Sequence, residues 1–229
     1  MQIISRNKFI KLKSHKTRKT SSNQWLQRQL NDQYVAQAKI DGYRSRAAYK
    51  LLEINNKFKL FKPGLKVIDL GASPGSWSQI AATLTLSEHK ALNNMRVIAV
   101  DLLMMEEIPG VLFIHKDFLD KDIISVVTAN LPDQSADIMI SDMAANTTGH
   151  AATDYIRTLY LCECALDFAL TILKPGGHFI SKIFDGGTEQ KLLQKIKQNF
   201  TIVKHFKPSA SRKESREYYL IALKRKTNL

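Results

Sequence analysis

The sequence predicts an α/β fold with a mostly parallel sheet of seven strands, helices on both faces and an antiparallel last strand. Strand-like and helix-like segments alternate from residue 67 onward, which is typical of such a sheet. A loop with two glycines, at 71–75, joins the first strand to a helix. The last two strands are separated by the polar segment 207–216, which is too short for a crossover helix and therefore requires an antiparallel pair.

Two helices are expected before the sheet. Apolar residues at helical spacing predict the first over residues 23–39, which Gly42 ends, and the second over residues 45–58. A Pro-Gly turn at 63–64 then leads the chain into the first strand.

Within the sheet region, the expected strands are short apolar runs rich in β-branched residues, and the expected helices are longer amphipathic segments. We expect strands at 67–69, 96–102, 112–115, 137–141, 178–184, 201–206 and 217–223. We expect helices at 77–86, 120–129, 154–173 and 188–200.

Length and composition predict one folded domain over residues 23–229. The chain has 229 residues, 44% of them hydrophobic, and no apolar run approaches the ~20 residues of a membrane span. Residues 1–22 contain seven Lys or Arg and no acid, which predicts a basic, disordered arm; a transit peptide is the alternative. Cys162 and Cys164 match no zinc or redox spacing, and the histidines form no ligand pattern. We therefore expect reduced thiols in a cytoplasmic protein that holds no metal.

The charge of the chain points to a polyanionic partner. The formal net charge is +13, and the basic residues gather in the N-terminal arm and in a second stretch at 204–226. A solvated surface would usually mix both signs, so we favour nucleic-acid binding.

The loop in the segment VIDLGASPGSW, residues 67–77, is typical of a nucleotide-like cofactor site at the carboxyl edge of a parallel sheet. It lacks both the Gly-x-Gly-x-x-Gly pattern of dinucleotide sites and the Lys-Ser/Thr of a P-loop. This argues against a nicotinamide oxidoreductase and favours an adenosine without phosphates, as in S-adenosylmethionine. The alternative is a plain strand-to-helix turn.

Acidic residues follow three successive strands. Asp101 can accept from the ribose hydroxyls of an adenosine, Asp117 from the adenine amino group, and Asp142 ends the fourth strand. One such acid is often only a helix cap, but three beside a glycine loop favour a shared crevice. Lys182 lies inside an apolar strand, where a lysine is costly unless it is paired or opens into a cleft. An edge strand with its lysine in solvent is the alternative.

These features occur together in a known pattern. From about residue 25 to 224 the chain resembles the FtsJ-type ribose 2′-O-methyltransferases. Six motifs carry the resemblance: GYRSR at 42–46 leading to Lys50, DLGASPGSW at 69–77, DLL at 101–103, SDMA at 141–144, KIF at 182–184 and SREYY at 215–219. Each motif is weak alone, but all six in order are a strong signal.

The resemblance implies a Rossmann-like class I methyltransferase fold, with S-adenosylmethionine as cofactor. It implies a Lys-Asp-Lys-Glu tetrad of catalytic residues and a set of cofactor contacts. The tetrad is Lys50, Asp142, Lys182 and Glu217, and the cofactor contacts are Gly75, Trp77, Asp101, Asp117 and Asp142. Ser76 and Ala145 depart from the family pattern, which has glycine and proline there, and we expect neither to abolish activity.

The resemblance also implies a substrate and a cellular setting. It implies methylation of a uridine in large-subunit (23S) ribosomal RNA, in the assembled 50S subunit, by a cytoplasmic monomer with no membrane contact. We expect residues 23–62 to contribute helices to RNA binding and to the active site. The alternatives are the same chemistry on transfer RNA or an mRNA cap, and a non-catalytic RNA-binding protein on the same scaffold.

The residue types fit this chemistry. A ribose 2′-hydroxyl is a poor nucleophile and must lose its proton as the new bond forms. We hypothesise that Lys182 accepts this proton, that Asp142 orients Lys182, and that Lys50 stabilises the developing oxyanion. A second lysine favours the neutral amine whereas Asp142 and Glu217 favour the ammonium, so both lysines could instead only position the hydroxyl.

The basic residues near the tetrad positions predict the path of the RNA. These are Arg44, Arg46, Arg212, Lys213 and Arg216. We expect them to contact phosphates, so RNA binding should weaken steeply with salt.

Overall fold

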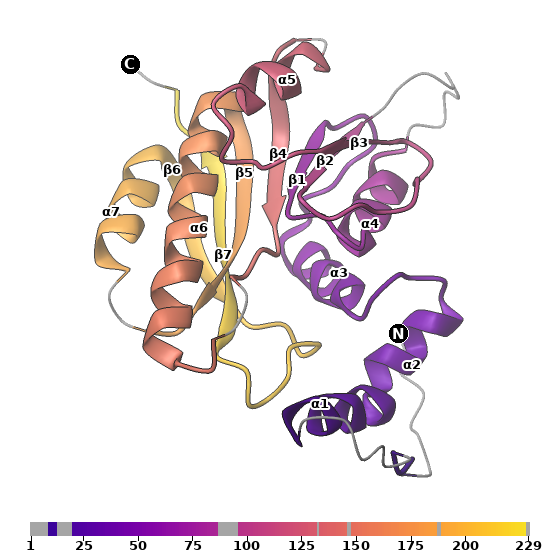
Figure 1. Ribbon diagram of the computed structural model, residues 1–229. Coiled ribbons are helices and arrows are strands. Elements are labelled where there is room, and N and C mark those ends of the chain that lie inside the picture. Colours follow the sequence, from indigo (N-terminus) through magenta and orange to yellow (C-terminus); the bar gives the residue numbers. More distant parts are fainter. Residues whose placement is uncertain are drawn as a thin grey trace.

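The computed structural model describes residues 9–12, 20–86, 96–131, 133–145, 148–186 and 189–227. Its centre is a seven-stranded sheet in the order β3-β2-β1-β4-β5-β7-β6 (Figure 1). The strands are β1 Val67–Leu70, β2 Val97–Asp101, β3 Val111–His115, β4 Ala136–Ser141, β5 Leu173–Phe184, β6 Phe200–Phe206 and β7 Glu217–Arg225.

The pairing of the strands confirms the predicted fold class. Strands β1 to β5 run parallel to one another, and β7 is antiparallel to both of its neighbours, β5 and β6. The short link between β6 and β7 permits only this reversal.

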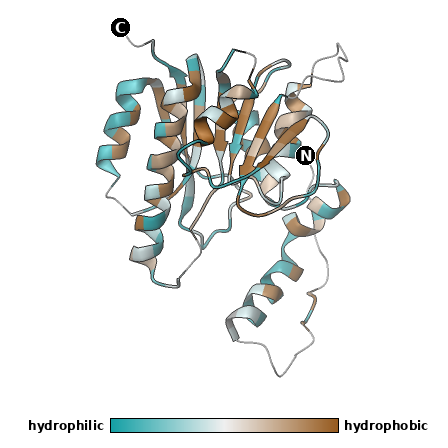
Figure 2. Ribbon diagram, turned by 45° about the horizontal axis from the view of Figure 1, so that its top comes forward, coloured by the Kyte–Doolittle hydropathy of each residue, from teal (hydrophilic) through white to brown (hydrophobic). Residues whose placement is uncertain are grey.

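Helices cover both faces of the sheet. One face packs against α3 Ala47–Phe58 and α4 Ser76–Thr85. The other packs against α5 Ile123–Ala129, α6 Ala151–Ile172 and α7 Gln190–Asn199. In Figure 2 the central strands are mostly brown, and α7 is brown in places and teal elsewhere. Because both faces are buried, these strands are continuous apolar runs rather than alternating ones.

The helical region before the sheet differs from the prediction. The single helix expected over 23–39 is wrong: the structure has α1 Thr20–Asn31 and α2 Gln33–Ile40, separated at Asp32. Asp32 has extended backbone, and its side chain accepts hydrogen bonds from the amides of Tyr34 and Val35 at 3.0 and 3.4 Å. Because the N-cap residue of a helix has non-helical backbone, Asp32 starts α2 and at the same time ends α1.

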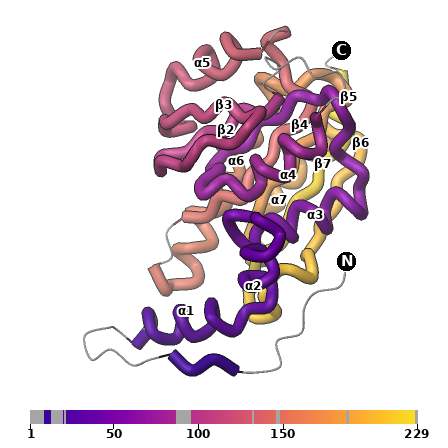
Figure 3. Tube along the Cα trace, turned by 90° about the vertical axis from the view of Figure 1, so that its right-hand side faces the viewer, coloured from indigo at the N-terminus to yellow at the C-terminus, as the bar shows by residue number. Residues whose placement is uncertain are grey.

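Most of the predicted basic arm lies outside the described residues. Of the described part, residues 9–12 lie beside α1 (Figure 3). The amide of Ile10 donates to Asn31 at 2.8 Å, and the amide of Leu12 donates to Gln27 at 2.8 Å.

Strand β5 begins earlier than predicted. Residues 174–177, which separate the expected helix from the expected strand, lie inside β5 as an irregularity. Ala136 of β4 pairs with Leu173 of β5, and the register resumes with Ile138 opposite His178. Gly176, at φ 81°, supplies a backbone conformation that other residues adopt with strain.

The sheet brings three strand ends to one edge. Leu70 of β1 lies in register with Val100 of β2 and Ser141 of β4, and Ser141 lies opposite Ser181 of β5. The glycine loop and the residues that follow β2 and β4 therefore meet at a single crevice, as expected for a doubly wound sheet. None of the helices among the described residues is long and apolar enough to cross a membrane.

Candidate active site

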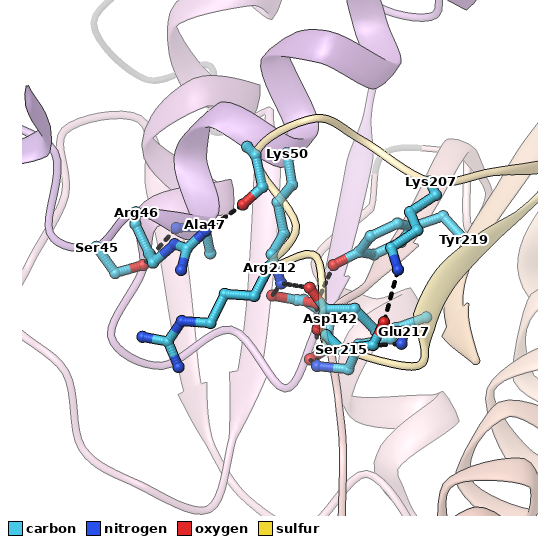
Figure 4. Close-up of polar contacts among 12 residues, drawn as sticks. Ser45, Arg46, Ala47, Lys50, Asp142, Lys207, Arg212, Ser215, Glu217 and Tyr219 are labelled. Atoms are coloured by element: carbon cyan, nitrogen blue, oxygen red, sulfur yellow. Dashed lines mark hydrogen bonds and ion pairs between the residues drawn. The ribbon is translucent and has the colours of Figure 1, made fainter. Parts of the chain in front are cut away.

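The four residues of the predicted tetrad lie together at this edge. Lys182 Nζ is 3.1 Å from one carboxylate oxygen of Asp142 and also donates to the Asp142 backbone carbonyl. Lys50 Nζ is 4.0 Å from the other oxygen of Asp142 and 2.8 Å from Glu217 Oε1. Figure 4 shows Lys50 and Glu217 pointing toward one another beside Asp142. The Nζ atoms of two lysines thus flank one carboxylate.

Strand register explains why residues so distant in sequence meet. In the antiparallel β5–β7 pair, Lys182 is opposite Tyr219 and Phe184 is opposite Glu217. Side chains two residues apart on a strand share a face, so Glu217 and Tyr219 are directed to the same side of the sheet. Helix α3 packs on that side and supplies Lys50.

Tyr219 is a member of the site to which the sequence analysis assigned no role. Its hydroxyl donates to Asp142 Oδ1 at 2.6 Å. The centroid of its ring lies 5.5 Å from the centroid of the Trp77 ring. Burial, and then the nearby Asp142 and Glu217 carboxylates, raise the pKa of Tyr219 well above its ordinary value. The hydroxyl therefore stays protonated as a donor. The feature of the sequence that could have identified Tyr219 is its position two residues after Glu217 in the same expected strand.

The charge state of Asp142 follows from its neighbours. Burial alone would raise the pKa of this carboxyl, but Lys182, Lys50 and the Tyr219 hydroxyl outweigh it and hold the pKa below its usual range. Asp142 is therefore a carboxylate at neutral pH and can orient an ammonium or amine beside it.

A cavity of about 540 Å³ opens beside the tetrad. Asp101, Asp117 and Asp142 line it together with Lys182, so the three predicted strand-end acids share one space. Its remaining lining is largely apolar: Val100, Leu102, Leu103, Phe118, Leu119, Met143, Ala144 and Leu161. This lining suits an adenosine. The carboxylates can accept hydrogen bonds from its hydroxyl and amino groups, and the apolar side chains can pack against the flat faces of its base.

The loops around this cavity are tied to one another. Asp101 accepts hydrogen bonds from the amides of Ser73, in the glycine loop, and Leu103, at 2.8 and 2.7 Å. Gly71, at φ 71°, leaves no room for a side chain, since a Cβ would lie 2.0 Å from the Met143 side chain. A larger residue at position 71 would collide at the mouth of the crevice.

Gly75 and Trp77, which were also predicted to contact the cofactor, are not among the residues that line this cavity. Gly75 precedes α4 at φ 103°, and a Cβ there would lie 2.8 Å from Arg44 Nη1. Trp77 is buried and donates from Nε1 to the Ala47 carbonyl at 2.9 Å, which ties α4 to α3. Ser76, the departure from the family pattern, shares a 2.7 Å hydrogen bond with the Ser45 hydroxyl.

Arg44, which was predicted to contact RNA, forms hydrogen bonds within the protein instead. Its guanidinium donates to three backbone carbonyls, those of Pro74 at 3.0 Å and of Glu106 and Glu107 at 2.8 Å. It therefore links the glycine loop to the segment after β2. Arg216 similarly donates to the carbonyl of Asp185.

A second cavity, of about 400 Å³, lies on the other side of Lys50 and Glu217. Of the five basic residues on the predicted RNA path, Arg46 and Arg212 line it, together with Arg28 of α1. The tetrad thus has an acidic and apolar cavity on one side and a largely basic one on the other.

Asp69, at the end of β1, is a buried acid that the sequence analysis left without a role. One oxygen accepts from the Ser78 hydroxyl at 2.6 Å, and the other has no hydrogen-bond partner among the described residues. Burial raises the pKa of Asp69 from 3.8 to about 7.

Comparison with known proteins identifies the family of the chain. Residues 43–225 match the family model for the FtsJ-like methyltransferase. The chain is 58% identical over 221 residues to the ribosomal RNA large subunit methyltransferase E of Rickettsia rickettsii, and 59% identical to that of Rickettsia bellii; each alignment covers 96% of both chains. A crystal structure of a ribosomal RNA methyltransferase from Plasmodium falciparum superimposes with a TM-score of 0.67 at 29% identity, covering 81% of this chain and all of that one.

Proposed function

Because the chain belongs to the FtsJ-like methyltransferase family, we propose that it methylates the ribose 2′-hydroxyl of a uridine in large-subunit (23S) ribosomal RNA. The chain is an S-adenosylmethionine-dependent methyltransferase. The observation that carries the proposed reaction is the tetrad of Lys50, Asp142, Lys182 and Glu217 at the border of the two cavities. The names of the Rickettsia relatives support ribosomal RNA of the large subunit as the substrate.

The first cavity suits the adenosine of S-adenosylmethionine. Asp101 would accept from the ribose hydroxyls and Asp117 from the adenine amino group, while the apolar lining would cover the base. Gly75 and Trp77 would contribute through their backbone at the start of α4, where amides have no partner within the helix. When bound, this cofactor supplies an activated methyl group on a sulfonium.

The residues of the tetrad would act on the RNA hydroxyl. Lys182, which lines the first cavity, would accept the 2′-hydroxyl proton as a neutral amine, and Asp142 would hold its Nζ in position. Lys50, which lines the second cavity, would stabilise the oxyanion that develops. Glu217 would fix Lys50 through an ion pair at 2.8 Å, and Tyr219 would fix Asp142 through a hydrogen bond at 2.6 Å.

We further propose that the enzyme is a monomer that acts in the cytoplasm on the assembled 50S subunit. The basic chain, with a net charge of +13, suits a particle made mostly of RNA. Residues 23–229 would form a single methyltransferase domain, to which residues 23–62 contribute Lys50 and the wall of the second cavity.

The test is transfer of tritiated methyl groups from S-adenosylmethionine to four substrates: undermethylated 50S subunits, naked 23S RNA, bulk transfer RNA and capped mRNA. We expect incorporation into 50S subunits by the wild type and none by Lys182→Ala, with transfer RNA and mRNA unlabelled. Labelling of transfer RNA or mRNA alone would support the same chemistry on another substrate. A wild type that labels nothing, yet binds RNA, would support a non-catalytic protein.

A further inference from the structure

We propose that a small cavity at the start of α6 binds the base of the nucleotide whose ribose is methylated. This cavity, the base pocket, has a volume of about 240 Å³ and is lined by Gly149, Ala151, Asp154, Tyr155, Phe184, Ser215 and Arg216. The inference rests on the proposed function and deepens it, because it assigns the residues that select the base next to the reacting hydroxyl.

The base pocket lies beside the tetrad. Phe184, at the end of β5, pairs with Glu217 of β7 and lies two residues after Lys182. Ser215 lines both the base pocket and the second cavity, which Lys50 and Glu217 also line. Its hydroxyl accepts a hydrogen bond from the amide of Glu217 at 3.2 Å (Figure 4). In a nucleotide the base is attached to the carbon next to the one that carries the 2′-hydroxyl. A ribose at the tetrad would therefore direct its own base toward this pocket.

The wall formed by Tyr155 is fixed before any RNA binds. The Tyr155 hydroxyl donates to Glu189 at 2.8 Å, and the Tyr218 hydroxyl donates to the other oxygen of the same carboxylate at 2.9 Å. The backbone of Gly186 lies against the Tyr155 ring, since a Cβ there would be 2.1 Å from Tyr155 Cε2. These contacts join α6, β7 and the loop after β5. A pocket with preformed walls costs less free energy to occupy than one that must first be ordered.

The chemistry of the lining suits an uncharged base rather than a phosphate. Tyr155 and Phe184 supply aromatic surface, against which a base can pack. The carboxylate of Asp154 is already engaged: it accepts from the amide and the hydroxyl of Thr148 at 2.8 and 2.7 Å and from the amide of Gly149 at 3.3 Å. Its negative charge would repel a phosphate, whereas it leaves an uncharged base unaffected.

The size and the donors of the base pocket favour uracil. Pockets for drug-sized molecules enclose roughly 300–1,000 Å³, so a cavity of about 240 Å³ takes a smaller group, such as a single pyrimidine ring. The Ser215 hydroxyl accepts from the Glu217 amide and keeps its own hydrogen to donate. Arg216, which is a donor only, uses one nitrogen on the Asp185 carbonyl. Such donors suit the two carbonyl oxygens of uracil, and a purine is one ring larger.

The test fills the base pocket from an exposed position. Ala151, at the start of α6, is exposed and lines the pocket, whereas the neighbouring Ala152 is also exposed but is not among the lining residues. Ala151→Leu places a larger side chain at the pocket, and Ala152→Leu, the matched control, adds the same group outside it. Both variants are measured by kcat/KM for undermethylated 50S subunits and by KM for S-adenosylmethionine. Circular dichroism and thermal unfolding check that each is folded.

We expect Ala151→Leu to lower kcat/KM for the subunit roughly tenfold to a hundredfold, because added methyl and methylene groups take the room that the base needs. The KM for S-adenosylmethionine should stay unchanged, and Ala152→Leu should keep the wild-type kcat/KM. Equal kcat/KM in the two variants overturns the base pocket while the methylation stands. A wild type that methylates no subunit overturns the proposed function instead.

A second measurement identifies the ligand as the base. Methyl transfer is compared between subunits that carry uridine and subunits that carry adenosine at the nucleotide that the wild type methylates. The wild type should prefer uridine by roughly tenfold or more. Tyr155→Ala, which widens the pocket, should reduce this preference several-fold, whereas Tyr155→Phe keeps the ring and should keep the preference. Equal transfer to both subunits by the wild type, or an unchanged preference in Tyr155→Ala, overturns the assignment.

Discussion

The carboxylate of Asp142 receives two direct donors, the Nζ of Lys182 at 3.1 Å and the hydroxyl of Tyr219 at 2.6 Å, with Lys50 Nζ at 4.0 Å. Each of these side chains lies on a different element from Asp142, so the carboxylate holds the tetrad together across the sheet edge. Lys182, Tyr219 and Lys50 can each be substituted in turn to measure their separate effects on the reaction.

Lys182→Arg separates a proton acceptor from a group that only positions the hydroxyl. Arginine keeps the charge but cannot take a proton at ordinary pH. If Lys182 is the base, kcat should fall by roughly 10²–10⁴-fold and lose its dependence on the titration of that residue. A pH–rate profile of both enzymes measures this. Substantial activity in Lys182→Arg would leave positioning and charge as the role of the lysine.

Tyr219→Phe should lower kcat with little effect on the KM for S-adenosylmethionine. The change removes one hydrogen bond to the Asp142 carboxylate but keeps the ring beside Trp77. Because hydrogen bonds to charged groups contribute about 1.5–3 kcal/mol, we expect a loss of roughly tenfold to a hundredfold in kcat. Unchanged kcat would show that Asp142 is held well enough by the lysines alone.

Asp69 should make the protein less stable as pH rises. Its pKa in the fold is about 7, raised from 3.8 by burial. Between these values the unfolded chain has lost the proton that the folded chain keeps, so the free energy of unfolding falls with increasing pH. Relative to Asp69→Asn, the wild type should lose roughly 2–3 kcal/mol between pH 5 and pH 8. Urea denaturation at both pH values tests this, and parallel pH dependence of the two proteins would contradict it.

At the scale of the elements, the glycine loop depends on a side chain from outside the sheet. Arg44 binds the carbonyl of Pro74 in the loop and those of Glu106 and Glu107 after β2. It therefore braces two of the segments around the first cavity, although its position in the sequence suggested RNA binding.

Arg44→Gln should raise the KM for S-adenosylmethionine several-fold, because the glycine loop loses one charge-assisted hydrogen bond and the segment after β2 loses two, so that both become less ordered. The salt dependence of the reaction with RNA should stay as in the wild type. Isothermal titration with S-adenosylmethionine and kcat/KM measured across salt concentrations check the two parts. If Arg44→Gln instead reduced the dependence of kcat/KM on salt and left the affinity for S-adenosylmethionine unchanged, Arg44 would be an RNA-binding residue.

The element pattern shows what could be predicted from the sequence. The alternation of strands and helices and the acids at strand ends were sufficient to predict the sheet and the edge that holds Asp101, Asp117 and Asp142, because periodicity and connection rules are local. The break at Asp32 was missed, since its capping preference competed with a helical pattern that continued on both sides. The role of Arg44 was missed because its three acceptors are backbone carbonyls, which no residue type reveals.

At the scale of the whole molecule, the tetrad joins residues from opposite ends of the chain. Lys50 and Glu217 meet because β7 inserts antiparallel between β5 and β6 while α3 packs over the same face. Burial and spacing alone did not predict this meeting; the order of six motifs did, through resemblance to a family. The two cavities lie on either side of the tetrad, and we propose that one takes the cofactor and the other the RNA.

The central claim, that this site methylates a ribose hydroxyl of large-subunit RNA, is tested most directly by alkaline hydrolysis of 23S RNA labelled in the 50S subunit. A 2′-O-methyl group removes the hydroxyl that alkali uses to break the chain. The account predicts that the wild type places the label in an alkali-resistant dinucleotide containing 2′-O-methyluridine, and that Lys182→Ala places none. Label released in mononucleotides, or label retained by Lys182→Ala, would contradict it.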